Sequence, residues 1–289
     1  MYDEVLAEKS TAKKDNIAKE RRRIEMKSFD VKGITIGEGM PKICVPLVGT
    51  DMEMLAREAE AADRSPCDLV EWRVDHYIFY VADRLRDLRE LTLPAEGLQV
   101  VRSRTNKPVM LTLRTSEEGG MLDIIRREYY TILRDIIESE DARPDLLDIE
   151  AFDTDDENGF DRVEFIAQMA REAGICTVLS NHDFDKTPPV EEIVKRICTM
   201  DKLGADLPKV AYMPSGEEDV YKVIEAARVA SEYCDKPFIA LSMGDEGLPT
   251  RICSGQQGTA VTFASIGEAS APGQIEASRM KMMLERYYS

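Results

Sequence analysis

A lysine in the middle of a short apolar segment is the first residue that could do chemistry. Lys209 lies in residues 207–214, a segment with the composition of a β-strand that Gly204 and two prolines bound. Alternation along a strand places Lys209 on the same face as Leu207 and Ala211. In an apolar interior an ammonium group tends to lose its proton, and the resulting amine can attack a ketone. A lysine can also extend its charged head to water, and this segment alone leaves both possibilities open.

The two histidines of the chain, His76 and His182, are the imidazole groups available for proton transfer near neutral pH. His182 shares a face with Ser180 at the end of the apolar segment 176–184, which indicates a strand terminus. His76 follows the segment 68–75 and is out of phase with its polar face, so we expect a solvated loop residue there. We therefore interpret His182 as the candidate acid and base.

Polar residues in predicted loops complete the candidate site. Glu118 precedes two glycines that let its loop fold back, so its carboxylate could orient His182, although a carboxylate at a helix start is also a favourable partner of the helix dipole. Arg251 offers a bidentate site for a carboxylate. The Pro-Gly turn within residues 270–274 could present Ser270 and Gln274 to a hydroxylated ligand.

Eight short apolar segments alternate with longer segments of helical periodicity, and these elements must position the candidate residues. The apolar segments are residues 43–48, 68–75, 108–114, 146–152, 176–184, 207–214, 238–243 and 260–266. The helical segments include residues 51–64, 121–139, 160–172, 190–203, 217–233 and 274–287. Eight strands that alternate with helices pair in parallel through right-handed crossovers and close the sheet. We predict an α/β fold, a (β/α)8 TIM barrel whose short N-terminal hairpin, residues 29–31 and 34–36, closes the bottom, with an open doubly wound sheet as the alternative.

Alternation within the segments predicts a polar barrel interior. The residues expected to point inward are Glu71, Arg73, Asp75, Met110, Thr112, Arg114, Asp148, Glu150, Ser180, His182 and Lys209. Barrel interiors are normally apolar, and catalytic groups lie toward the carboxyl ends of the strands. Because burial of many ionisable groups is costly, two explanations remain: a salt-bridge network that fills the barrel, or a polar site at its mouth. The positions of the residues favour the mouth.

Composition limits the partners of the chain. A formal net charge of −17 over 289 residues and a pI near 4.7 disfavour nucleic acid and anionic membranes as partners. The six cysteines form no Cys-x-x-Cys pair, as expected for reduced thiols of a cytoplasmic protein, and no residues have metal-ligand spacing. We find no signal peptide, membrane span or nucleotide-binding glycine motif. We expect residues 1–26 to form a charged extension and residues 27–289 a single catalytic barrel.

Six motifs occur in order from about residue 27 to the end of the chain. They are Gly-Glu-Gly-Met-Pro-Lys (37–42), Glu-Trp-Arg-Val-Asp (71–75), Leu-Arg-Thr with Glu-Gly-Gly (113–120), Ser-Asn-His-Asp-Phe-Asp-Lys-Thr-Pro (180–188), Ala-Asp-Leu-Pro-Lys-Val-Ala (205–211) and Ser-Ala-Pro-Gly-Gln-Ile (270–275). Together they resemble the type I 3-dehydroquinate dehydratases. The resemblance implies a barrel that needs neither metal nor added cofactor. It also implies dehydration of 3-dehydroquinate to 3-dehydroshikimate through a lysine imine, in the shikimate pathway of aromatic amino acid biosynthesis.

The resemblance also implies roles for individual residues. Lys209 would form the imine, His182 would act as acid and base, and Glu118 would orient the histidine. The substrate-binding residues would be Glu71, Arg73, Arg114, Arg251, Ser270 and Gln274, with Arg251 as the partner of the substrate carboxylate. A homodimer is expected, because dimers are usual in this family. A class I aldolase and a non-catalytic scaffold barrel are the alternatives. The His182 motif and the paired arginines disfavour the aldolase, and the retention of every polar group that the chemistry needs disfavours the scaffold.

Overall fold

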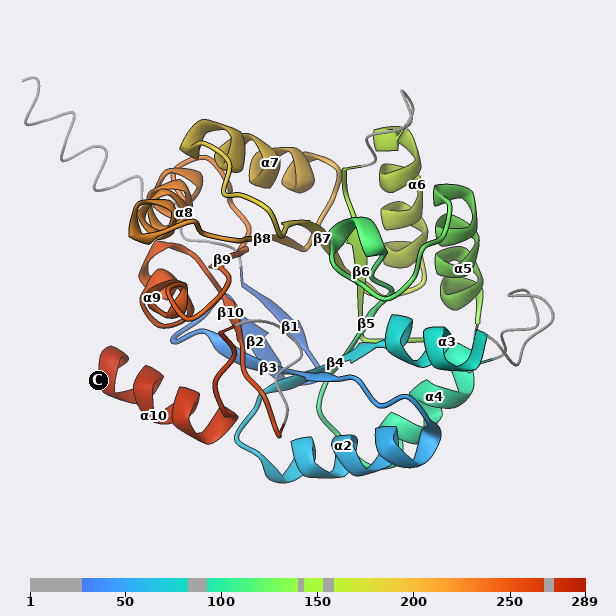
Figure 1. Ribbon diagram of the computed structural model, residues 1–289. Coiled ribbons are helices and arrows are strands. Elements are labelled where there is room, and N and C mark those ends of the chain that lie inside the picture. Colours follow the sequence, from blue (N-terminus) through green and yellow to red (C-terminus); the bar gives the residue numbers. More distant parts are fainter. Residues whose placement is uncertain (1–27, 83–92, 140–142, 153–158, 268–272) are drawn as a thin grey trace, which may run out of the picture.

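Eight parallel strands form a barrel in the computed structural model, which describes residues 28–82, 93–139, 143–152, 159–267 and 273–289 (Figure 1). The strands are β3 (Lys42–Leu47), β4 (Leu69–Arg73), β5 (Val109–Thr112), β6 (Leu146–Glu150), β7 (Cys176–Asp183), β8 (Leu207–Tyr212), β9 (Ile239–Ser242) and β10 (Val261–Phe263). From β3 to β9 each strand pairs with the next one along the chain, and β10 pairs with β3. A parallel bridge from Phe238 to Thr259 joins the ends of β9 and β10. The predicted barrel is confirmed, and the open doubly wound sheet was the wrong alternative.

Helices surround the strands in Figure 1, with their apolar faces toward the sheet. They are α2 (Met52–Arg64), α3 (Val74–Ala82), α4 (Leu93–Arg102), α5 (Arg126–Glu138), α6 (Gly159–Glu172), α7 (Val190–Lys202), α8 (Glu217–Ala230), α9 (Leu248–Cys253) and α10 (Ala277–Tyr288). In α2 the side chain of Asp51 caps the first turn by accepting from the Met54 N–H, at 2.8 Å. The buried residues Leu55, Ala59 and Ala62 follow at helical spacing, so this helix buries one stripe.

The segment predicted as one strand, residues 68–75, changes to a helix at Val74. The pairing of β4 with β5 ends at Arg73, after which Val74, Tyr77 and Ile78 are buried with the three- and four-residue spacing of a helix. His76 therefore lies on α3 and is partly buried, which corrects the prediction of a solvated loop residue.

The N-terminal hairpin closes the bottom of the barrel, as predicted. Strands β1 (Phe29–Val31) and β2 (Ile34–Ile36) are joined by Lys32 and Gly33, whose φ angles of 51° and 81° suit a two-residue hairpin turn. Val31 and Ile36 belong to one buried cluster with the inward-facing side chains at the amino ends of the strands. These include Cys44, Leu69, Met110, Leu146, Val178 and Leu207.

The barrel interior therefore divides into an apolar lower half and a polar upper half. The other face of each strand packs under the helices, where Trp72 and Phe238 are fully buried, so the predicted alternation holds on both sides of the sheet. Within the described ranges, no helix has the length and apolar character needed to cross a membrane. The predicted extension, residues 1–26, lies outside the described residues.

Candidate active site

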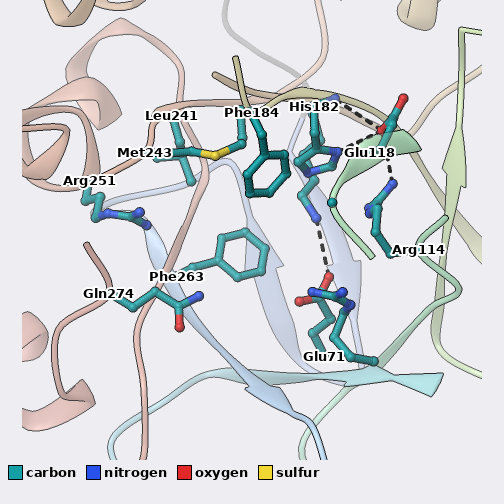
Figure 2. A pocket seen from close by; sticks show the side chains of 14 residues that line it. Glu71, Arg114, Glu118, His182, Phe184, Leu241, Met243, Arg251, Phe263 and Gln274 are labelled. Carbon is teal, nitrogen blue, oxygen red and sulfur yellow. Dashed lines mark hydrogen bonds and ion pairs between the residues drawn. The ribbon is translucent and has the colours of Figure 1, made fainter. Parts of the chain in front are cut away.

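The carboxyl ends of the strands bring the sequence-predicted polar residues to one cavity (Figure 2). Its lining includes Glu71, Arg73, Arg114, Glu118, His182, Lys209, Arg251 and Gln274. Ser270, the other predicted loop residue, lies outside the described residues. The empty space in and above the cavity is about 690 Å³, which includes space open to solvent.

Lys209 lies on β8 with only 5% of its surface exposed. Its Nζ is 3.0 Å from Asp148 Oδ2 and 3.3 Å from Glu71 Oε1, and it lies 4.8 Å from the ring centre of Phe263. The lysine head therefore stays inside the barrel instead of extending to water. Its surroundings are not purely apolar, because two carboxylates offset the cost of burying an ammonium group.

His182 and Glu118 form a hydrogen-bonded pair at the mouth of the barrel. The ring Nδ1 of His182 lies 2.9 Å from Glu118 Oε2, and the backbone N–H of His182 donates to the same oxygen at 3.1 Å. Glu118 ends the short 3-10 helix η2 (Ser116–Glu118), which Gly119 terminates with a left-handed φ of 80°. The predicted fold-back of this loop is confirmed, and the imidazole Nε2 is the ring nitrogen left for a ligand.

Arg114 connects the carboxylates of the site. Its guanidinium donates to Asp148 at 2.8 Å and to Ser180 at 3.0 Å, and it contacts Glu118 and Glu150, each at 3.3 Å. Lys209 and Arg114 thus share Asp148, so the lysine and the histidine pair belong to one charged network. A salt-bridge network was one of the two explanations for the polar barrel interior. The network exists, but it does not fill the barrel, because it borders an open cavity.

Burial and these charges move the pKa values of the site in different directions. Burial and the cations Arg114 and Lys209 lower the pKa of His182 well below its usual value, so the ring is neutral at pH 7. Burial and the nearby carboxylate of Glu150 raise the pKa of Glu118 to about 8. Asp148 behaves oppositely: although burial favours protonation, Arg114 and Lys209 lower its pKa to about 2.

The other predicted arginines differ in how they are held. Arg73 makes two bonds of 2.8 Å to Asp75, which also accepts the N–H of Met121. Arg251 lies on α9 with 3% exposure, and its burial lowers the pKa of the guanidinium to about 10. Figure 2 shows Arg251 and Gln274 together on the side of the cavity opposite Arg114. A carboxylate bound there would form a charge-assisted pair with this buried cation.

Apolar residues form a wall that sequence reasoning missed. Leu241, Met243 and Phe263 line the cavity from β9, its end and β10, and Phe184 lines it from beyond β7. Alternation along residues 260–266 places Val261 and Phe263 on the inward face of the strand. The inward direction of Phe263 could therefore have been predicted from the sequence. The cavity therefore combines a charged side with an apolar side.

Eight parallel strands with ionisable groups gathered at their carboxyl ends define a (β/α)8-barrel enzyme. A sequence profile of the family described as Type I 3-dehydroquinase matches residues 43–289. The chain belongs to this family, and it is therefore an enzyme of the hydro-lyase class.

Relatives and solved structures agree with this assignment. The chain is 38% identical over 260 residues to the 3-dehydroquinate dehydratase of Listeria welshimeri, covering 90% of this chain and 98% of the relative. The crystal structure of the type I enzyme from Clostridium difficile with covalently modified comenic acid is similar with a TM-score of 0.80 and 36% identity, covering 91% of this chain and 98% of that one. The Geobacillus kaustophilus 3-dehydroquinate dehydratase gives a TM-score of 0.80 at 32% identity, covering 91% and 97%.

Proposed function

We propose that this enzyme removes water from 3-dehydroquinate to give 3-dehydroshikimate, by way of an imine between Lys209 and the substrate ketone. The observation that carries the proposal is one cavity that contains a buried lysine and a neutral histidine whose Nδ1 is already hydrogen-bonded to the carboxyl group of Glu118. The names of the relatives support the substrate, and the shikimate pathway follows from the reaction. The covalently modified ligand described for the Clostridium difficile enzyme is consistent with a nucleophile in such a site.

The first steps form the imine. Lys209 must give up a proton before its amine can attack, and Glu71, 3.3 Å from Nζ, is an acceptor there. Asp148 also bonds Nζ but stays ionised, because its pKa is about 2. The amine adds to the ketone carbon, and the resulting carbinolamine loses its hydroxyl as water to leave a protonated imine. This cation withdraws electrons from the neighbouring carbon, so a proton on that carbon becomes acidic enough for a general base to remove.

The later steps need one group that first accepts and then donates a proton. Nε2 of His182 accepts the proton from the carbon beside the imine, and the electron pair forms the new double bond as the β-hydroxyl leaves. His182 then protonates the departing hydroxyl, so that water is released. Hydrolysis of the imine frees the enone product and the lysine. General acid and base catalysis of this kind contributes about 100- to 10,000-fold to a rate.

The remaining side chains fix the position of the substrate. Arg251 would pair with the substrate carboxylate through its planar guanidinium, with Gln274 and the predicted residue Ser270 closing over the ligand. Glu71 and Arg73 would contact hydroxyl groups. Arg114 would contact the substrate and also hold Asp148 and Glu118 in place, since it is bonded to both.

Borohydride trapping tests this proposal. Incubation with 3-dehydroquinate should produce the conjugated enone, followed by its ultraviolet absorbance. Adding borohydride during turnover should inactivate the enzyme and add the mass of the reduced ligand to the peptide that carries Lys209. An adduct on Lys186 or Lys202, or turnover with no trappable adduct, would contradict the mechanism, and absence of the enone would contradict the activity.

We also propose that the enzyme acts in the cytoplasm as a homodimer, as the resemblance to the family implies. Light scattering should then give twice the chain mass of 32.6 kDa. A value equal to a single chain at micromolar concentration would exclude the dimer.

A further inference from the structure

Asn181 lies between the two inward-facing residues of β7, Ser180 and His182, so its side chain starts on the opposite face of the strand. It is 6% exposed and is fully engaged in hydrogen bonds. Its Oδ1 accepts from Arg196 Nη1 at 2.5 Å and from the Tyr212 hydroxyl at 3.0 Å. Its Nδ2 donates to Glu118 Oε1 at 3.3 Å.

The partners of Asn181 determine which way its amide faces. A guanidinium can only donate, so the atom that contacts Arg196 must be the carbonyl oxygen and not the nitrogen. Arg196 is itself held from α7, where its Nε donates to Glu192 at 3.0 Å and its guanidinium lies 5.3 Å from the ring centre of Phe152. The Asn181 amide is thus fixed with its N–H groups toward Glu118.

Hydrogen-bond donors consequently surround both oxygens of Glu118. Oε1 faces the Asn181 amide, and Oε2 faces the backbone N–H of His182, the His182 ring and Arg114. Only the His182 ring nitrogen in this set can act as either donor or acceptor. A proton on Oε1 would point at an N–H group and replace a favourable contact with a repulsive one.

The charge of Glu118 decides which nitrogen of the neutral His182 ring carries the proton. If Glu118 is a carboxylate, Nδ1–H donates to it and Nε2 presents a lone pair to the cavity. If Glu118 is protonated, its O–H donates to Nδ1 and the ring proton moves to Nε2, which can then no longer accept a proton from a substrate. Burial brings the pKa of Glu118 to about 8. Near neutral pH, a single hydrogen-bond donor is therefore enough to change the ratio of the carboxylate to the protonated form of Glu118.

We propose that Asn181 is a positioning residue that favours the carboxylate form of Glu118 and thereby favours the His182 tautomer with the proton on Nδ1. The catalytic consequence rests on the proposed role of His182 as the base, whereas the tautomer is a property of the enzyme without substrate. Arg196 and Tyr212 act through Asn181 by fixing the direction of its amide.

Other charges around the pair stay in place when Asn181 is changed. The groups that face Glu118 and His182 from the neighbouring elements are Arg73, Arg114, Asp148, Glu150 and Lys209. None of them bonds to the Asn181 amide. A change in titration after substitution of Asn181 by an uncharged residue therefore reports the lost amide donor.

Nitrogen-15 NMR of enzyme labelled at histidine tests the proposal directly. The chain has two histidines, so His76 serves as an internal reference. In the parent enzyme we expect His182 to carry its proton on Nδ1 above about pH 8, where Glu118 is a carboxylate. Asn181→Asp keeps the side-chain shape and the contacts with Arg196 and Tyr212, but it replaces the donor with a carboxylate and so adds a negative charge beside Glu118. Asn181→Ala removes the side chain altogether.

Both variants should move the pH at which the His182 tautomer changes upward by about one unit, because loss of a donor raises the pKa of the carboxyl. The same shift should appear on the acidic side of the plot of kcat against pH. In each variant kcat at pH 7 should therefore fall by about tenfold and recover as pH rises. Tyr212→Phe retains the Arg196 contact and should shift the profile less than either variant.

A folded Asn181→Asp enzyme with an unchanged tautomer and an unchanged pH profile would overturn the proposal. The finding of an Nε2–H tautomer in the parent well above pH 8 would do the same. Thermal melts decide whether a variant is folded, and the Asp variant remains informative if the Ala variant is not. If the parent shows no activity on 3-dehydroquinate but the tautomer moves as expected, the proposed function fails and the positioning role stands.

Discussion

Lys209 and Arg114 show how single residues can be charged and buried in the same site. Each cation has at least two acceptors within 3.3 Å, and Asp148 is shared between them. Removing one member of such a network leaves its partner buried without compensation, which typically costs about 3–5 kcal/mol. Substitutions here affect both folding and chemistry, so each experiment on the site needs a measure of stability beside the measure of activity.

Substitution of Lys209 and substitution of His182 should have different effects on adduct formation and turnover. Lys209→Ala removes the amine, so borohydride should trap no adduct. His182→Ala leaves the amine able to bind the ketone, so an adduct should accumulate while turnover falls by at least about a hundredfold. Mass spectrometry and the enone absorbance check both outcomes. His76→Ala, on the partly buried face of α3, is the control and should turn over at close to the parent rate; the opposite ranking of the two histidine variants would contradict the assignment.

Arg251 should control binding of the substrate carboxylate. Arg251→Ala should raise KM by at least about tenfold, because a charge-assisted bidentate contact contributes more than about 1.4 kcal/mol. Arg251→Lys should restore only part of the affinity, since an ammonium group cannot form the two parallel bonds. Steady-state kinetics measure both effects. A variant that loses kcat with KM unchanged would show that Arg251 acts on the reaction and not on binding.

At the scale of the element, η2 positions a catalytic-site carboxylate through a tight backbone turn. The N–H of Gly120 donates to the Thr115 carbonyl at 2.7 Å, and a Cβ at Gly120 would lie 2.0 Å from the carbonyl oxygen of Arg114. Backbone atoms cannot move aside as a flexible side chain can. The turn is therefore possible only with glycine at this position, which explains how a loop of few residues holds Glu118 against β7.

Gly120→Ala should displace η2 and move Glu118 away from His182. We expect a loss of stability of about 1–3 kcal/mol, as for other overpacked sites, together with at least about tenfold lower kcat. Thermal melts and the enone assay measure the two effects. Gly216→Ala is the matched control, because a Cβ there meets nothing within 4 Å and its φ of 166° is extended backbone. Equal activity of the two variants would mean that the turn does not set the position of Glu118.

At the scale of the whole molecule, the hairpin and the inward-facing residues at the amino ends of the strands form an apolar core inside the barrel. The ionisable side chains lie at the carboxyl ends of the strands. This division lets one barrel contain a stable core and a charged site. It also links the stability of the barrel to pH, because the buried carboxylates are stable only in defined charge states.

Asp148 should stabilise the enzyme above pH 4 and lose this contribution in acid. Its folded pKa of about 2 is below the usual value of 3.8, so the unfolded chain binds the proton more readily than the folded one. The contribution is present above pH 3.8, falls as pH decreases toward 2, and amounts to about 2 kcal/mol.

Urea unfolding between pH 2.5 and 6 should show this dependence. Asp148→Asn should be less stable than the parent at pH 6, since it leaves Lys209 and Arg114 with one acceptor fewer. The difference in unfolding free energy between the two proteins should narrow as pH falls. A difference that stays constant over this range would mean that Asp148 does not titrate with folding.

Local sequence periodicity determined the strands of this protein and the direction of their side chains. Glu71, His182 and Lys209 were placed inward by alternation alone, because a strand sends successive side chains to opposite faces whatever lies around it. The hairpin at residues 29–36 and the fold-back at Gly119 were also local, since both depend on backbone conformations that glycine favours. The family resemblance added the roles, which remain proposals.

Only the tertiary structure decided which of these side chains meet. Glu118 and His182 are 64 residues apart, and their contact requires closure of the barrel and the exact path of η2. Asn181 points away from the cavity by alternation, yet it reaches Glu118 because that carboxylate comes from a loop above the strand. His76 joined a helix because β4 lost its pairing partner after Arg73. Contacts of this kind depend on strand register and loop path, which no local pattern in the sequence specifies.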